Sequence, residues 1–200
     1  MPGYRIRYRL SRFALQCAFL VSSAGYIEQL QAQEVRVDID PAKTSVTFTL
    51  DATMHTVHGT FKLKSGNLKF DSASGAASGL FVLDATTAET GNSGRDRKMH
   101  KNVLQSTQFP EIAFVPRRVV GKVELSGSSK VDVEGTMRIH GAEHPMTLTF
   151  ALQTKDSDVT AISNFPVPYQ AWGMKNPSNF FLHVSDKVQL TINAVGRISR

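Results

Sequence analysis

Apolar and polar residues alternate with a period of two along most of the chain after residue 34. Val46, Phe48 and Leu50 form one such run, and residues 131–139 form the most regular one. This period places successive side chains on opposite faces of a β-strand. Turn residues separate the runs, so the pattern predicts about eight or nine short antiparallel strands. The period of two begins at Val35, and the expected strands then cover approximately residues 46–50, 57–70 with a bend after Ser65-Gly66, 80–83, 112–120, 131–139, 146–152, 159–165 and 188–194.

One segment departs from this period and predicts a short helix over residues 94–105. Ser93 precedes Asp96 by three residues, a spacing in which the hydroxyl caps the helix and the carboxylate lies at its positive end. Pro110 lies beyond the helix, and the residue before a proline avoids the helical region. The sequence therefore indicates a single helix inserted between strands, capped by Ser93.

The predicted helix has an apolar stripe. Met99 and Val103 are four residues apart and share one face, with Leu104 beside them. The basic residues are expected to form its solvated face: Arg95, Arg97, Lys98 and Lys101. The stripe therefore faces another part of the protein, which the helical pattern alone does not identify.

The number of strands predicts the fold class. A single antiparallel sheet of this size exposes two edges unless it closes on itself, and closure into a barrel removes both. We therefore expect an all-β protein built as an antiparallel barrel of about eight strands, with one short helix. The interior of such a barrel is either filled by side chains or holds one small or slender ligand.

The first 32 residues are typical of a secretory signal peptide. Arginines precede an apolar run over residues 13–21, and small or neutral residues follow up to Ala32. Gln16 interrupts the run, which is shorter than the ~20 apolar residues of a membrane-spanning helix. The expected organisation is a signal peptide over residues 1–32 and a barrel domain over residues 33–200. Cys17 is the only cysteine, so the exported protein would contain no thiol.

The formal charge of +6 does not indicate a nucleic-acid-binding protein. Four arginines and one glutamate within residues 1–32 contribute +3, which leaves +3 for residues 33–200. The remaining chain has no lysine- and arginine-rich run with interleaved aromatic residues. We therefore expect no nucleic-acid partner.

The histidines provide two candidate metal clusters. His55 and His58 flank one predicted turn, and His140, Glu143 and His144 share another. These spacings match no established zinc motif, and histidines in polar turns are usually solvated. We therefore predict no metal site.

The apolar residues of the strands and the helix are the stronger candidates for a binding site. Aromatic and methionine side chains form an adaptable apolar lining, although they can equally fill a dry core. The candidate ligand-binding residues are Phe48, Phe61, Phe81, Met99, Val103, Phe114, Met137, Phe150, Phe165 and Trp172.

Four ordered motifs resemble the YceI-like family. They are His55-Thr56-Val57-His58-Gly59-Thr60-Phe61, Gly91-Asn92 with Arg95-Asp96, Phe109-Pro110-Glu111-Ile112-Ala113-Phe114, and Gly135-Thr136-Met137-Arg138-Ile139-His140-Gly141. The resemblance spans approximately residues 35–198. It implies an exported bacterial protein with a lipocalin-like barrel, whose internal tunnel takes a polyisoprenoid lipid such as an isoprenoid quinone or a polyprenyl chain, with the helix near the tunnel.

The expected function is that of a periplasmic or secreted, non-enzymatic protein that holds such a lipid and has no other cofactor and no catalytic residue. Transient contact with a membrane and a homodimer are both compatible with the sequence. One alternative is an enzyme that acts on an apolar molecule and uses His100 or His140 as acid or base. The other is a stress-related structural protein whose barrel core is filled.

Overall fold

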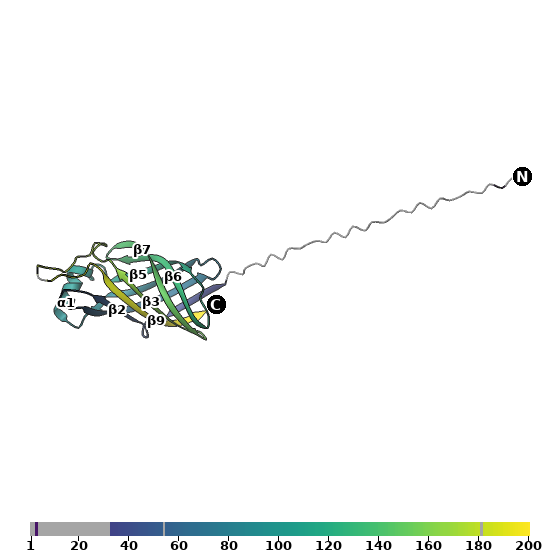
Figure 1. Cartoon of the computed structure of the whole chain (residues 1–200), viewed down its shortest axis with the longest axis horizontal. Coiled ribbons are helices and arrows are strands. Elements are labelled where there is room, and N and C mark those ends of the chain that lie inside the picture. The colour runs from purple at the N-terminus through teal and green to yellow at the C-terminus, as the bar shows by residue number, and fades with distance from the viewer. Residues whose placement is uncertain (1–2, 4–32, 54, 181) are drawn as a thin grey trace. The chain divides into compact units, whose positions relative to one another are not determined.

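Strands dominate the computed structural model of the protein, which describes residue 3 and residues 33–53, 55–180 and 182–200 (Figure 1). The predicted signal peptide over residues 1–32 lies outside the described residues, apart from Gly3. The strands are β1 (Glu34–Ile39), β2 (Ser45–Leu50), β3 (Val57–Asp71), β4 (Ala77–Glu89), β5 (Glu111–Val120), β6 (Gly127–Ile139), β7 (Ala142–Lys155), β8 (Asp158–Val167) and β9 (Val188–Ser199). The helix α1 (Ser93–Lys98) continues into a π-helical segment, η1 (Met99–Leu104).

The strands form one closed antiparallel sheet. From β3 to β9, each strand pairs with its neighbour in the sequence. Closure is completed by β1 and β2, because each of them pairs with both β3 and β9. The barrel is therefore of the up-and-down type, and the prediction of a closed antiparallel barrel with one short helix is confirmed.

Nine strand segments make eight positions around the barrel because β1 and β2 share one position. β1 pairs with residues 67–71 of β3, whereas β2 pairs with residues 57–61 of the same strand. A turn over residues 40–44 separates the two segments. An eight-stranded barrel has just enough interior for packed side chains or one slender ligand.

The longest strand, β3, bends where the sequence changes parity. Its pairing with β4 shifts register between Thr60 and Lys62 and again between Leu63 and Ser65. The second shift lies next to Ser65-Gly66, beyond which the apolar residues change from odd to even positions. Bulges of this kind increase local twist and help a sheet to close.

The helix is close to the predicted position, but its cap differs. Asn92 is the N-cap, and its Oδ1 accepts a hydrogen bond from the Arg95 backbone N–H at 3.0 Å. Ser93 is already the first helical residue, so the prediction of a Ser93 cap is wrong; Asn and Ser cap almost equally well, and only the extended backbone of Asn92 decides between them. The helical segment ends at Gln105, which takes a left-handed conformation with φ of 47°.

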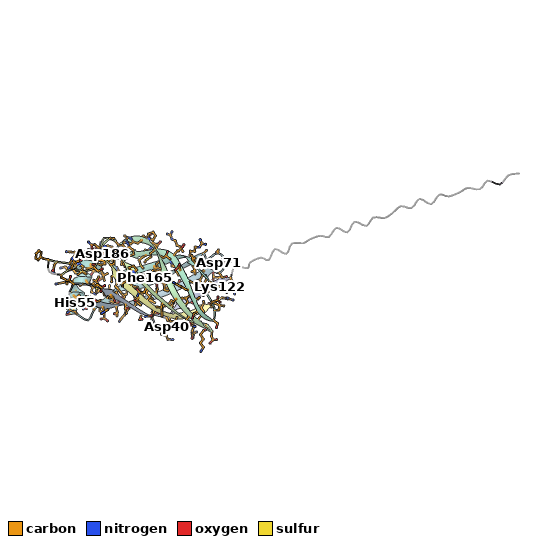
Figure 2. All side chains as sticks on the ribbon, in the orientation of Figure 1. Asp40, His55, Asp71, Lys122, Phe165 and Asp186 are labelled. Carbon is orange, nitrogen blue, oxygen red and sulfur yellow. The ribbon has the colours of Figure 1, made fainter. Side chains whose placement is uncertain are left out.

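The connections between the strands lie at the two ends of the barrel. The end that carries α1 also has the connections over residues 51–56, 140–141 and 168–187, because these join strands that run to the same end. Figure 1 shows α1 at one end and the C-terminus at the other. Figure 2 shows His55 at the α1 end and Lys122 at the opposite end. We call the α1 end the mouth of the barrel.

A glycine in β6 makes room for an aromatic ring that faces inward. A Cβ atom on Gly135 would lie 2.6 Å from Cζ of Phe114 and 2.5 Å from the backbone oxygen of Val115. We expect Gly135→Ala to lower the free energy of unfolding by about 1–3 kcal/mol, because the ring or the strand must shift. Chemical denaturation measures this loss. Gly94→Ala is the control, because its Cβ would meet no atom closer than 3.4 Å; equal losses in both variants would contradict the packing argument.

Candidate functional site

The barrel encloses a cavity of about 1040 Å³ that opens at the mouth. Ligand pockets in proteins typically have volumes of about 300–1,000 Å³, so this cavity lies at the upper end of that range. Buried side chains of the strands form its wall, among them Val46, Leu148 and Leu190. Since the barrel interior is not filled by side chains, it has room for a ligand.

The structure brings nine of the ten predicted ligand-binding residues to the lining of this one cavity. They are Phe48, Phe61, Phe81, Met99, Val103, Phe114, Met137, Phe150 and Phe165. Phe165 lies near the middle of the barrel in Figure 2. Their contact with a ligand stays a prediction, but their shared location is now established.

Trp172 is the exception, because it is not among the residues that line the cavity. Its indole ring stacks on the imidazole of His144, with ring centroids 4.1 Å apart and an angle of 4° between the planes. The connection over residues 168–187 places Tyr169 and Met174 in the lining instead. This segment has no regular period, so its pattern does not indicate which of its large side chains face the cavity.

Other lining residues could have been found from strand parity. Val46 and Leu50 lie on the same face of β2 as Phe48, and Leu148 lies on the same face of β7 as Phe150. The basic residues of the helix were not expected to line the cavity, because the helical pattern assigned them to a solvated face.

The cavity is divided by polarity. Every lining residue that comes from a strand is apolar, from Ile39 in β1 to Ala194 in β9. All charged and amide side chains of the lining come from the connections at the mouth. No aspartate or glutamate among the described residues lines the cavity. This arrangement fits an amphiphile with an apolar tail inside and a polar group at the mouth.

Two hydroxyl groups that reach the cavity wall are engaged by the protein itself. The Thr44 hydroxyl donates to the backbone oxygen of Asp40 at 2.8 Å. The Ser178 hydroxyl donates to Oδ1 of Asn176 at 2.6 Å. A ligand that needs many hydrogen bonds would therefore find few partners inside the barrel, whereas a hydrocarbon chain needs none.

Thr90 anchors the helix to the rim of the barrel. Oδ1 of Asp96 accepts hydrogen bonds from the Thr90 backbone N–H at 3.0 Å and from its hydroxyl at 2.5 Å. Nε and Nη2 of Arg95 donate to the hydroxyl and backbone oxygen of Thr90, at 2.7 Å and 3.0 Å. Asp96 and Arg95 thus both hold the helix through Thr90 rather than through an ion pair with each other.

A histidine in η1 holds the helical segment against β4. The imidazole of His100 lies 2.9 Å from the Ala88 backbone oxygen through Nε2 and 2.9 Å from the Ser106 hydroxyl through Nδ1. Because a carbonyl only accepts, Nε2 carries the proton in this contact. His100 therefore connects η1 to β4, while Met99 and Val103 line the cavity.

Tyr169 is a buried phenol at the mouth. Its hydroxyl donates to the backbone oxygen of Ser185 at 2.7 Å, which positions the connection over residues 168–187. Burial raises the pKa of Tyr169 to about 12, and the negative charge of Asp186 adds to this. The neutral phenol is therefore strongly favoured in the folded protein.

This shift predicts a loss of stability at alkaline pH. The folded pKa of Tyr169 exceeds its ordinary value of 10.0, so the folded protein keeps the proton more tightly than the unfolded chain. The free energy of unfolding should therefore be unaffected by this group below pH 10 and should fall as the pH rises from 10 towards about 12. Denaturation at several pH values measures the slope. Tyr169→Phe should flatten it, and an unchanged slope in that variant would assign the loss to other groups.

The two histidine clusters considered as metal sites do not form such a site in the described part of the chain. Among the described residues there is no group of three or more His, Cys, Asp or Glu side chains that could hold a metal ion. Glu143 pairs with Arg138 at 2.8 Å, and His140 packs on Phe109 with ring centroids 4.7 Å apart.

In the part of the chain that the structure describes, no helix has the length and hydropathy needed to cross a bilayer.

The fold and the cavity together define a lipocalin-like barrel protein with an apolar interior. A family model described as the YceI-like domain matches residues 38–196. The chain belongs to the YceI-like family, since this match covers most of its length.

Curated relatives agree with the assignment to this family. A UPF0312 protein of Pseudomonas putida strain W619 is 31% identical over 149 residues, which cover 72% of this chain and 73% of the relative. A UPF0312 protein of Vibrio parahaemolyticus is 27% identical over 121 residues, covering 59% of this chain and 62% of that protein.

Solved structures share the fold at low sequence identity. BcnA of Burkholderia cenocepacia superposes with a TM-score of 0.66 and 20% identity, covering 79% of this chain and 99% of BcnA. A polyisoprenoid binding domain from Saccharophagus degradans gives a TM-score of 0.62 and 12% identity, covering 82% of this chain and 98% of that domain. The YCEI protein of Campylobacter jejuni gives a TM-score of 0.60 and 17% identity, covering 74% of this chain and 88% of that protein.

Proposed function

We propose that this protein is an exported, non-enzymatic binding protein that holds a polyisoprenoid-type lipid, such as an isoprenoid quinone or a polyprenyl chain, in the barrel cavity. The observation that carries the proposal is the division of the lining by polarity. The strands contribute only apolar side chains to the lining, and its charged and amide side chains come from the connections at the mouth. A lipid with a long apolar chain and one polar end would place the chain against the apolar wall and the polar end at the mouth.

The comparisons support the ligand class. A structural neighbour of the same fold is described as a polyisoprenoid binding domain. The volume of about 1040 Å³ accommodates more than a typical drug-sized molecule, as a prenyl chain requires. The same volume argues against the alternative of a structural protein with a filled core.

The enzyme alternative has less support. Neither His100 nor His140 is among the described residues that line the cavity. His100 is engaged with Ala88 and Ser106, and His140 packs on Phe109. An acid or base must come within hydrogen-bond reach of its substrate, which these positions do not provide for a molecule in the barrel.

A titration of purified protein with a polyprenol, an isoprenoid quinone and a saturated fatty acid, each delivered in detergent, tests the ligand class. We expect saturable uptake of the two isoprenoid lipids. If the protein took up only the fatty acid, its ligand would be another apolar molecule and not an isoprenoid lipid. If it took up none of the three lipids, the proposed binding function would be overturned.

Export is tested separately. The basic and apolar sequence before Gln33 supports removal of residues 1–32 by a signal peptidase. Cell fractionation with sequencing of the mature N-terminus should find the processed chain in the periplasm or the medium. An unprocessed chain in the cytoplasmic fraction would contradict export without affecting the proposed ligand.

A further inference from the structure

The mouth of the cavity is surrounded by positive charge. Arg97, Lys98 and Lys101 of the helical segment line the opening, and Lys175 lines it from the connection over residues 168–187. All four residues are exposed. None of the four forms an ion pair with another residue in the described parts of the chain. We call these four residues the basic rim.

The carboxylates at this end of the barrel lie outside the lining of the opening. Among the described lining residues there is no aspartate or glutamate. Asp96, on the same helix, is part-buried and is occupied by two hydrogen bonds from Thr90. The Asp51 carboxylate, in another connection at this end, accepts from the Thr56 hydroxyl at 3.0 Å. The charged side chains that border the opening itself are therefore all cationic, whereas the carboxylates elsewhere at this end keep their negative charge.

An apolar side chain projects from the same end. Phe180 is 95% exposed, and it follows directly on residues 175–179, which all line the cavity mouth. Exposed phenylalanine beside lysine and arginine is the combination that binds the interface of an anionic bilayer: the ring enters the headgroup region and the cations remain at the phosphates.

We propose that the basic rim and Phe180 form a docking face for the surface of an anionic phospholipid bilayer, with the mouth of the cavity directed at the membrane. In this orientation a lipid tail passes between bilayer and barrel without crossing bulk water. The purpose of the docking face rests on the proposed function, but its charge and exposure exist whether or not the cavity binds a prenyl lipid.

Charge reversal at the basic rim tests the docking face. The probe is vesicles of phosphatidylcholine with phosphatidylglycerol and no isoprenoid lipid, compared with vesicles of phosphatidylcholine alone. All protein is purified as the cell processes it, so that every variant shares one N-terminus. Each basic residue near an anionic surface is worth about fivefold in binding. Arg97→Glu, Lys98→Glu and Lys101→Glu together should therefore weaken vesicle binding by at least ~100-fold.

The matched control reverses three exposed lysines at the end opposite the mouth, Lys122→Glu, Lys130→Glu and Lys155→Glu, and has the same net charge. We expect it to bind vesicles more tightly than the rim variant by at least about tenfold. Phe180→Ala should cost about tenfold, because the ring no longer enters the interface. Equal binding by the rim variant and its control would overturn the proposal. The proposal would also be overturned if the wild type failed to bind these vesicles and bound only vesicles to which an isoprenoid lipid had been added, since binding would then depend on the ligand and not on the anionic surface.

Uptake of a polyprenol from detergent distinguishes this failure from failure of the proposed function. If the rim variant takes up polyprenol normally but loses vesicle binding, the docking face is supported independently of the cavity. If no variant takes up polyprenol while vesicle binding still follows the rim charges, the proposed ligand is wrong and the docking face stands.

Discussion

Leu148→Asp should lower the free energy of unfolding by about 4 kcal/mol or more, one of the largest effects that we expect from a single substitution. Leu148 is 2% exposed and lies in the wall of the cavity. An aspartate there would face apolar strand residues, because none of the cations among the described lining residues comes from a strand. Its carboxylate would lose hydration without gaining a partner. Urea denaturation followed by circular dichroism measures the loss.

Ala151→Asp is the control for this prediction. Ala151 lies on the same strand, is exposed and stands opposite Lys130 in the register with β6. An aspartate at this position meets water and a neighbouring cation, so its effect on stability should be within about 0.5 kcal/mol. If the two variants lost equal stability, Leu148 would not face an apolar interior.

Ala194→Trp should reduce the affinity for long prenyl chains by at least about tenfold while the fold is kept, because the indole ring would fill part of the cavity. Ala194 lines the cavity and lies six residues into β9, which corresponds to about 20 Å from the mouth end of that strand. A ring at this depth leaves the outer part of the cavity open. Short prenyl chains should therefore bind nearly as before.

The measurement compares uptake of a long and a short polyprenol by the wild type, by Ala194→Trp and by Ala151→Trp, whose side chain points outward. The unfolding free energy of Ala194→Trp should change by less than about 1.5 kcal/mol, since the ring enters open space rather than a packed core. Equal affinity of all three proteins for the long chain would mean that the chain does not reach Ala194.

The barrel itself could be predicted because a period of two is a local property of the sequence. Phe48 and Met137 alternate with polar neighbours, and this indicates the inward face of their strands before any pairing is known. The period does not indicate which distant segments pair with each other. That β1 and β2 share one position in the barrel depends on their contacts with β3 and β9, which are remote in the sequence.

The composition of the cavity mouth was harder to predict for the same physical reason. On an isolated helix, Met99 faces an apolar surface and Lys98 faces solvent, which the helical period correctly indicates. The structure places the helix across an opening, so both residues border the same cavity. Lys175 joins them from a connection that follows β8 and has no period. Only the closed barrel brings these cations together.

The most direct test of the account is the identity of the lipid that accompanies the native protein. Protein purified under mild conditions from its own host would be extracted with organic solvent, and the extract analysed by mass spectrometry. We predict an isoprenoid-type lipid at about one molecule per chain, as a cavity of about 1040 Å³ allows. Repeated recovery of no apolar lipid, together with no uptake of quinones or polyprenols added in detergent, would contradict the account.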